Sequence, residues 1–215
     1  MLQADELAVK ARLDVAAAEE RAVLQRAYDA VRRRRAFFVV LAFTGLRKGE
    51  AFRMRWSWID FDGRMLRVRV AKRGSSEIPL CKTVANVLKA LGPGPADDLV
   101  FPGSPREAGR AAPLDRTKML TDMRVPLVRA LQAAKVDTRG VTLHTFRRTF
   151  LTLIEEIPGV TFSMVVALAR HGKGSTGVTA RYLKPSNDIL HAALAELERR
   201  VLGTGNVIPL FGRPA

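Results

Sequence analysis

Residues 143–185 read LHTFRRTFLTLIEEIPGVTFSMVVALARHGKGSTGVTARYLKP and combine helical periodicity with reactive side chains. His144 and Arg147 are three positions apart, so on a helix they share one face. The apolar residues that follow give this helix a stripe that faces a core: Phe150, Leu151 and Ile154. Pro158 and Gly159 come next and are expected to end the helix.

The second half of this stretch contains another predicted helix, Thr161–Ala169, which is followed by His171 and then by Tyr182. Arginine can bind a phosphate through paired donors and stabilise the charge that develops on it. A tyrosine oxygen can attack phosphorus when a base removes its proton, and histidine suits that role near neutral pH. This set of residue types therefore indicates most of a phosphodiester-cleaving active site.

Three segments resemble sequence boxes of the tyrosine recombinases, the phage integrase family. HTFRRTF at 144–150 resembles the H-x-x-R box. ARHGKGSTGVTARYLKP at 169–185 resembles the box with the second histidine and the nucleophilic tyrosine. FTGLRKGEAFRMRW at 43–56 resembles the box with the first arginine. The boxes occur in the family's order, and the resemblance covers residues 31–185, which is most of the chain.

The resemblance implies a catalytic set, which consists of Arg47, Lys72, His144, Arg147, His171 and Tyr182. In this interpretation Tyr182 attacks the scissile phosphate and becomes joined to the 3′ end of the DNA. Arg47 and Arg147 hold the non-bridging oxygens and stabilise the pentavalent transition state. His144 acts in proton transfer at the tyrosine.

The remaining roles also follow from the resemblance. Lys72 lies in the turn between the second and third predicted strands, where the family has a lysine that protonates the leaving 5′ oxygen. His171 supports the phosphate, and Glu50 is the acidic residue that holds a guanidinium in place. The energy of the cleaved bond is kept in the phosphotyrosine, so no nucleotide, metal or other cofactor is needed.

Composition independently indicates a polyanionic partner. The chain of 215 residues has a net charge of +15 and a pI near 11.1, which favours nucleic acid first and an anionic membrane surface second. Double-stranded DNA is the predicted partner. The arginines predicted to contact the DNA backbone are Arg67, Arg69, Arg73 and Arg148. For the basic run Arg32–Arg35, a phosphate contact and a solvated helix end remain equal alternatives.

Several other classes of protein are disfavoured. The single cysteine, Cys81, excludes an internal disulfide framework and fits a reducing cytoplasm, as for a bacterial or phage-derived protein associated with the nucleoid. Three histidines and one cysteine show no metal-ligand spacing. The longest apolar run, Ala36–Leu46, is too short to span a bilayer, and the N-terminus lacks a signal-peptide pattern. No membrane association is expected.

The predicted fold is mainly α-helical with a small three-stranded antiparallel sheet (α+β), the fold of a tyrosine recombinase catalytic domain. One helix is predicted to contain His144 to Ile154 and to end at Pro158 and Gly159, and another is predicted over 161–169, as above. The further predicted elements are one or two helices over 1–35, helices over 36–43, 81–91, 117–134 and 187–202, and strands over 57–62, 65–70 and 77–80.

A single catalytic domain is expected over 1–202, with a tail at 203–215. The C-terminal helix within 186–202 could dock on a neighbouring subunit, as the family often does, or pack on its own domain. Members of the family commonly carry an N-terminal helical domain that clamps the DNA, and nothing before Val31 is long enough for it. The chain is therefore expected to be an excised catalytic domain or a naturally short member.

The chain departs from the family pattern near the nucleophile. Members commonly have Leu-Gly-His, whereas this chain has Ala169, Arg170 and His171, and the interval from His171 to Tyr182 is longer than usual. The predicted function is site-specific recombination by a homotetramer on DNA that is a monomer or weak oligomer when free. A relaxing DNA topoisomerase with the same catalytic set and a non-catalytic DNA-binding module are the alternatives.

Overall fold

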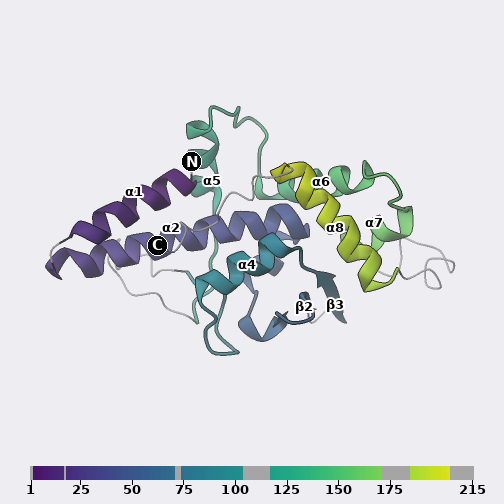
Figure 1. The fold of residues 1–215 in the computed structure, drawn as a ribbon, viewed down its shortest axis with the longest axis horizontal. Coiled ribbons are helices and arrows are strands. Elements are labelled where there is room, and N and C mark those ends of the chain that lie inside the picture. Colours follow the sequence, from purple (N-terminus) through teal and green to yellow (C-terminus); the bar gives the residue numbers. More distant parts are fainter. Residues whose placement is uncertain (1, 17, 71–73, 104–116, 171–184, 204–215) are drawn as a thin grey trace.

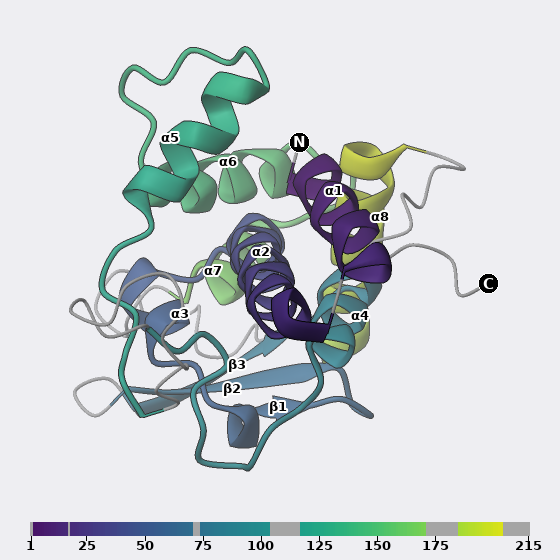
Figure 2. The same cartoon turned by 90° about the vertical axis from the view of Figure 1, so that its left-hand side faces the viewer.

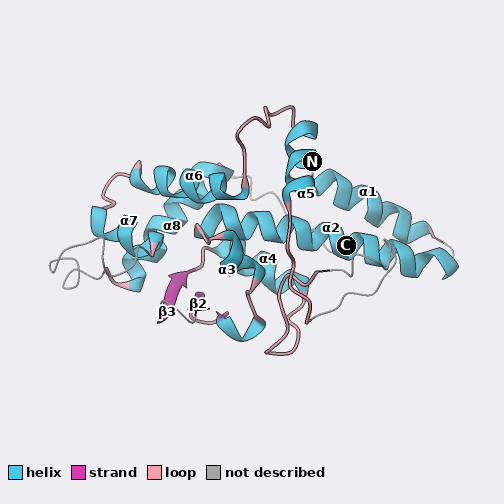
Figure 3. Cartoon of the chain, turned by 180° about the vertical axis from the view of Figure 1, so that it is seen from behind, coloured by secondary structure: helices cyan, strands magenta, loops and turns pink. Residues whose placement is uncertain are grey.

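The computed structural model describes residues 2–16, 18–70, 74–103, 117–170 and 185–203 (Figure 1). Helices dominate, and the strands form one antiparallel sheet in the order β1-β2-β3, which confirms the predicted fold class (Figure 3). The elements in chain order are α1 (Leu2–Val15), α2 (Ala18–Thr44), α3 (Lys48–Phe52), the 3₁₀ helix η1 (Trp56–Trp58), β1 (Ile59–Asp60), β2 (Met65–Val70), β3 (Gly74–Pro79), α4 (Lys82–Leu91), α5 (Arg124–Ala133), α6 (Leu143–Glu155), α7 (Phe162–Ala169) and α8 (Asn187–Leu202).

Helix α2 lies at the centre of the fold. Figure 2 looks along this helix and shows α1, α4, α6 and α8 around it, with the sheet on one side. The segment AFFVVLAF at 36–43 has no charged residue, and a helix that is apolar all round is stable only when other elements cover it. Phe37, Val40 and Leu41 are accordingly fully buried, so this half of α2 forms the middle of the core.

The structure differs from the prediction that residues 1–35 and 36–43 form separate helices. Helix α2 runs through both segments, since no glycine or proline interrupts residues 18–44. The basic run lies inside this helix, where Arg35 Nη1 donates to Glu6 Oε2 at 2.8 Å and Arg32 Nη2 donates to the carbonyl of Ala90. These two arginines therefore form contacts within the chain and do not mark a solvated helix end.

The sheet presents one buried and one exposed face. Leu66, Val68 and Ile78 are buried, whereas Arg67 and Arg69 alternate with them on the exposed face of β2. The third strand begins at Gly74, before the predicted start at Glu77, because β2 continues to pair with the polar residues Ser75 and Ser76. Backbone hydrogen bonding, which a hydrophobic pattern does not report, sets this boundary.

Helix α5 is shorter than the predicted helix 117–134 and begins at Arg124. Pro126 lies in its first turn, where the missing backbone N–H has no partner inside the helix in any case. The carboxylate of Asp122 accepts the backbone N–H of Arg124 at 2.9 Å, which fixes this start. The proline therefore begins the helix and does not bend it.

The C-terminal helix α8 packs on its own chain. Its apolar face is buried against α2, α6 and β3, and consists of Leu190, Ala193, Leu194 and Leu197. Glu198 Oε1 accepts the backbone N–H of Thr83 at 2.5 Å, which joins α8 to the first turn of α4. The tail at 204–215 lies outside the described residues. Among the helices that the structure describes, none is long and apolar enough to cross a membrane.

Gly45 lies between the end of α2 and the start of α3. Its φ is +58°, a left-handed conformation that glycine adopts without a steric penalty. A Cβ atom added at this position would lie 2.5 Å from Cδ1 of Phe150 in α6. The backbone after α2 can therefore approach α6 closely only because residue 45 has no side chain.

We expect Gly45→Ala to lower the free energy of unfolding by about 2–4 kcal/mol, since it combines left-handed strain with a clash in a packed core. Gly140→Ala is the matched control, because Gly140 has a φ of +71° and open space at the Cβ position. The free energy of unfolding of this control should fall by about 1 kcal/mol. Urea denaturation of both variants tests the difference, and equal losses would contradict the proposed close approach.

Candidate active site

Arg47, the first predicted phosphate-binding arginine, is the N-cap residue of α3. Its backbone N–H donates to Glu50 Oε2 at 2.8 Å, and its Nη1 donates to Glu50 Oε1 at 3.3 Å. The three-residue spacing lets one carboxylate cap the helix and hold the guanidinium at the same time. The Arg47 side chain is 35% exposed, so part of its guanidinium is open to a ligand.

Arg147, the second predicted phosphate-binding arginine, is almost completely buried, at 4% exposed. Helix α6 begins after Thr142, whose hydroxyl accepts the backbone N–H of His144 at 3.3 Å, and Arg147 follows one turn later. Its Nη1 donates to the carbonyl of Gly45, and its Nη2 donates to the carbonyl of Ala169. One guanidinium therefore joins the end of α2 to the end of α7.

Arg170 belongs to the same cluster, although the sequence analysis assigned it no role. Its Nη2 donates to Glu50 Oε2 at 2.7 Å, and its side chain is 5% exposed. The residue ends α7 in a left-handed conformation, with φ 51° and ψ 44°, which costs a residue other than glycine about 1–2 kcal/mol. The departure from the family's glycine at this position was the available signal.

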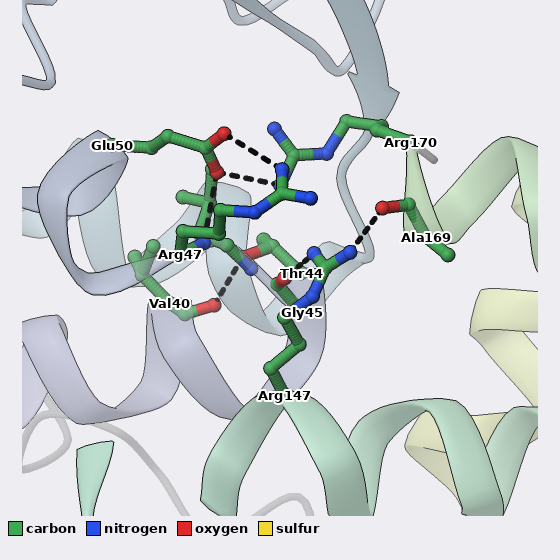
Figure 4. Close-up of polar contacts among 9 residues, drawn as sticks. Val40, Thr44, Gly45, Arg47, Glu50, Arg147, Ala169 and Arg170 are labelled. Atoms are coloured by element: carbon green, nitrogen blue, oxygen red, sulfur yellow. Dashed lines mark hydrogen bonds and ion pairs between the residues drawn. The ribbon is translucent and has the colours of Figure 1, made fainter. Parts of the chain in front are cut away.

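Figure 4 shows the guanidinium groups of Arg47, Arg147 and Arg170 converging from α3, α6 and α7, with Glu50 beside them. Burial first, and then the charges of Arg47 and Arg170, lowers the pKa of Arg147 to about 10. Burial also lowers the pKa of Arg170, whereas its pairing with Glu50 opposes that shift. Three cations therefore surround one carboxylate, and the cluster carries excess positive charge.

A carboxylate in such surroundings stays ionised. Burial works to raise the pKa of Glu50, but the hydrogen bond and charge of Arg170, followed by those of Arg47, hold it below its ordinary value. The Nε atom of Arg170 is buried and has no acceptor among the residues that the structure describes. Excess positive charge and an unmatched donor are the properties of a site that binds an anion.

The predicted histidine of α6 is placed at the surface. His144 lies in the first turn of the helix and is exposed, whereas Arg147, one turn on, is buried. Arg148 is also exposed, on the outer side of α6. The two residues of the predicted box therefore differ in accessibility, since His144 is open to solvent and Arg147 is enclosed.

The two arginines of β2, Arg67 and Arg69, differ in their contacts with acidic side chains. Arg67 is paired on both sides, with Asp60 Oδ2 at 3.5 Å and with Glu77 Oε1 at 3.2 Å. Arg69 is exposed on the same face of β2, one residue before the strand ends. The charge of Arg67 is thus partly neutralised by its neighbours, which weakens its expected contribution to phosphate contacts.

The other predicted site residues lie outside the part of the chain that the structure describes. They are Lys72, Arg73, His171 and Tyr182. Arg170 and Pro185 are the described residues on either side of the segment that contains His171 and Tyr182. Within the described ranges, no three His, Cys, Asp or Glu side chains are grouped as they would be around a metal ion.

We expect Glu50→Gln to lower the free energy of unfolding near neutral pH by about 3 kcal/mol, because it leaves buried guanidinium groups without a counter-charge. The pKa of Glu50 is lower in the folded state than its ordinary value of 4.5. The stability that its charge supplies is therefore fully present above pH 4.5 and is lost as the pH falls through the folded-state pKa.

The difference in stability between wild type and Glu50→Gln should consequently narrow as the pH falls below 4.5. Urea denaturation at a series of pH values measures it. A difference that stays constant down to the acid limit of folding would show that Glu50 does not carry the charge that the cluster requires.

The phage integrase family matches residues 15–187. Prophage integrase IntF of Escherichia coli (strain K12) is 27% identical over 174 residues, which cover 80% of this chain and 35% of that protein. The integrase from mycobacterium phage Brujita has a similar fold, with a TM-score of 0.55 and 21% identity, over 90% of this chain and 56% of that chain.

The matched region contains all three boxes and the arginine cluster, from the helix that precedes Arg47 to the start of α8. The chain spans 35% of the length of the prophage integrase and 56% of the phage integrase structure. By the extent of its match, this chain belongs to the phage integrase family.

Proposed function

We propose that this protein is a site-specific DNA recombinase that cleaves and rejoins DNA strands through a 3′-phosphotyrosine intermediate. The observation that carries the proposal is the convergence of Arg47 and Arg147 at a site with excess positive charge. Membership of the phage integrase family and the order of its boxes support the same conclusion.

The proposed reaction is a pair of transesterifications. The Tyr182 oxygen attacks phosphorus, the bond from phosphorus to the 5′ oxygen breaks, and the tyrosine becomes joined to the 3′ phosphate. His144 takes part in transfer of the tyrosine proton, and Lys72 gives a proton to the leaving oxygen. The 5′ hydroxyl of a partner strand then attacks the phosphotyrosine, and the tyrosine oxygen leaves and takes back a proton, so the number of phosphodiester bonds is conserved.

The arginines would stabilise the transition state by electrostatics. Attack on a phosphodiester adds negative charge to the non-bridging oxygens, and fixed guanidinium groups become more favourable as that charge grows. Arg147 is held by the carbonyls of Gly45 and Ala169, so little reorganisation is needed during the reaction. Arg47 is the more exposed of the two and would meet the phosphate first. His171 is proposed to support the same phosphate.

Double-stranded DNA is the proposed partner, and a homotetramer on DNA is the proposed active assembly, with a monomer or weak oligomer in the absence of DNA. The net charge of +15 supports binding to a polyanion. Among the residues outside the cluster, Arg69 and Arg148 are exposed cations that can contact the backbone, and Arg73 is proposed to join them. Such a reaction requires access to bacterial or phage DNA, so the proposed location is the cytoplasm.

We expect Tyr182→Phe to abolish a covalent protein–DNA complex and to change DNA affinity by less than about twofold, because it removes one nucleophilic oxygen among many phosphate contacts. The substrate is a pool of nicked duplexes with randomised sequence, in which loss of the short cleaved strand traps the intermediate. Covalent complexes are detected on a denaturing gel, and sequencing of the trapped DNA identifies the site.

Tyr28→Phe is the matched control, since the chain has two tyrosines, and Tyr28 packs on α2 against Arg32. It should retain the covalent complex. A complex that persists in Tyr182→Phe would contradict the assigned nucleophile. Absence of any complex with wild type would favour a non-catalytic binding module, and relaxation of supercoiled plasmid without strand exchange would favour a topoisomerase.

The two sheet arginines should contribute unequally to DNA binding. Arg69→Ala is expected to reduce the slope of log affinity against log salt by about 0.9, the value for one released counterion. Arg67→Ala should reduce it by less, because Asp60 and Glu77 already pair with that side chain. Fluorescence anisotropy with a short duplex at several salt concentrations measures both slopes. A larger change for Arg67→Ala would contradict the backbone contact that we assign to Arg69.

A further inference from the structure

We propose that Arg170 is a positioning residue of this active site, which holds Glu50 and so leaves the guanidinium of Arg47 available to the scissile phosphate. The inference deepens the proposed function and rests on it. It concerns a position where the family commonly has glycine and this chain has an arginine. The arginine side chain can therefore make contacts that the family's usual glycine cannot make.

The backbone at this position favours glycine. Arg170 adopts φ 51° at the end of α7, a left-handed conformation that non-glycine residues rarely take. An arginine here strains the backbone, and it also places a guanidinium in a buried setting, which lowers its pKa. Both features are unfavourable for an arginine at this position. We therefore attribute the presence of this side chain to its contact with Glu50.

The geometry of Glu50 shows how the two arginines share its carboxylate. The distance from Arg170 Nη2 to Glu50 Oε2 is 2.7 Å, whereas that from Arg47 Nη1 to Glu50 Oε1 is 3.3 Å. The Arg170 side chain is 5% exposed and that of Arg47 is 35% exposed. Of the two side chains, the buried Arg170 thus makes the shorter contact with the carboxylate and the accessible Arg47 makes the longer one, while the backbone N–H of Arg47 also donates to Oε2 at 2.8 Å.

The difference between these two contacts matters because a phosphate and Glu50 compete for the same N–H donors of Arg47. A carboxylate paired with Arg47 alone would neutralise it and would repel an incoming anion. The charge of Arg170 offsets that of Glu50, and the 2.7 Å contact holds the Glu50 carboxylate between the two guanidinium groups. Arg47 keeps its orientation through Glu50 and retains donors for the phosphate oxygens.

The same residue secures the end of α7. The carbonyl of its neighbour Ala169 accepts a hydrogen bond from Arg147, while the side chain of Arg170 itself donates to Glu50 of α3. Two consecutive residues thus connect the last turn of α7 to both phosphate-binding arginines. The chain continues from Arg170 directly into the segment with His171 and Tyr182. Arg170 therefore couples the position of the arginines to the point where the nucleophile segment begins.

The test measures single-turnover cleavage at saturating DNA, with the nicked duplex selected by wild type, together with DNA affinity from anisotropy. Arg170→Gly suits the left-handed backbone, and we expect it to cleave about 10- to 100-fold more slowly, since misplaced catalytic groups lose rates of that order. DNA affinity should change by less than about threefold, because many other phosphate contacts supply it. Arg170→Lys, which keeps the charge, should recover part of the rate.

Arg64→Gly is the matched control. Arg64 is another arginine in a left-handed conformation, with φ 47°, in the turn before β2 and outside the cluster. The control removes the same side chain and the same charge from the same type of backbone position. It should cleave at the wild-type rate, so a slow Arg170→Gly cannot be explained by loss of net charge or by a glycine in a turn.

A double-mutant cycle with Glu50→Gln tests whether Arg170 acts through Glu50. The double variant should cleave no more slowly than Glu50→Gln alone, because Arg170 then has nothing to hold. Wild-type cleavage by Arg170→Gly, or rate losses that multiply in the double variant, would overturn the inference while the proposed function stands. Absence of cleavage by wild type itself would overturn the proposed function, and the inference with it.

Discussion

The buried guanidinium of Arg147 is the contact on which the arrangement of the site depends. It donates to the carbonyls of Gly45 and Ala169, which lie at the C-terminal ends of α2 and α7. Such carbonyls have no partner inside their helices and sit at the negative end of the helix dipole, so a cation between them is favourable. One side chain thereby fixes two helix ends, and each of them leads into a segment with predicted catalytic residues.

The positive charge of the cluster lowers the stability of the fold and favours binding of an anion. Burial, together with the charges of Arg47 and Arg170, lowers the pKa of Arg147 to about 10, and Glu50 offsets only part of the positive charge. Strain at Arg170 adds to the cost. A bound anion would relieve the repulsion, which supports our proposal that the cluster binds a phosphate.

Helix α2 explains how segments distant in sequence meet. Its uncharged half is buried by α4, α6 and α8, and Gly45 at its end allows Phe150 to approach the backbone. The local parts of this arrangement were predictable, because the spacing of His144 and Arg147, of Arg47 and Glu50, and the alternation in β2 each follow from helix or strand geometry. The fold class followed from the same periodicities and from the family's boxes.

The sequence by itself determined the helix that carries His144 and Arg147, the alternating strand β2 and the candidate arginines, because these depend on neighbours a few positions away. Tertiary structure decided the continuity of α2, the early start of β3 and the contact of Arg170 with Glu50. The contact of Arg170 with Glu50 joins residues 120 positions apart, and Arg170 makes it from a left-handed conformation at the end of α7. No local pattern records such a contact, since it exists only when the core brings the helix ends together.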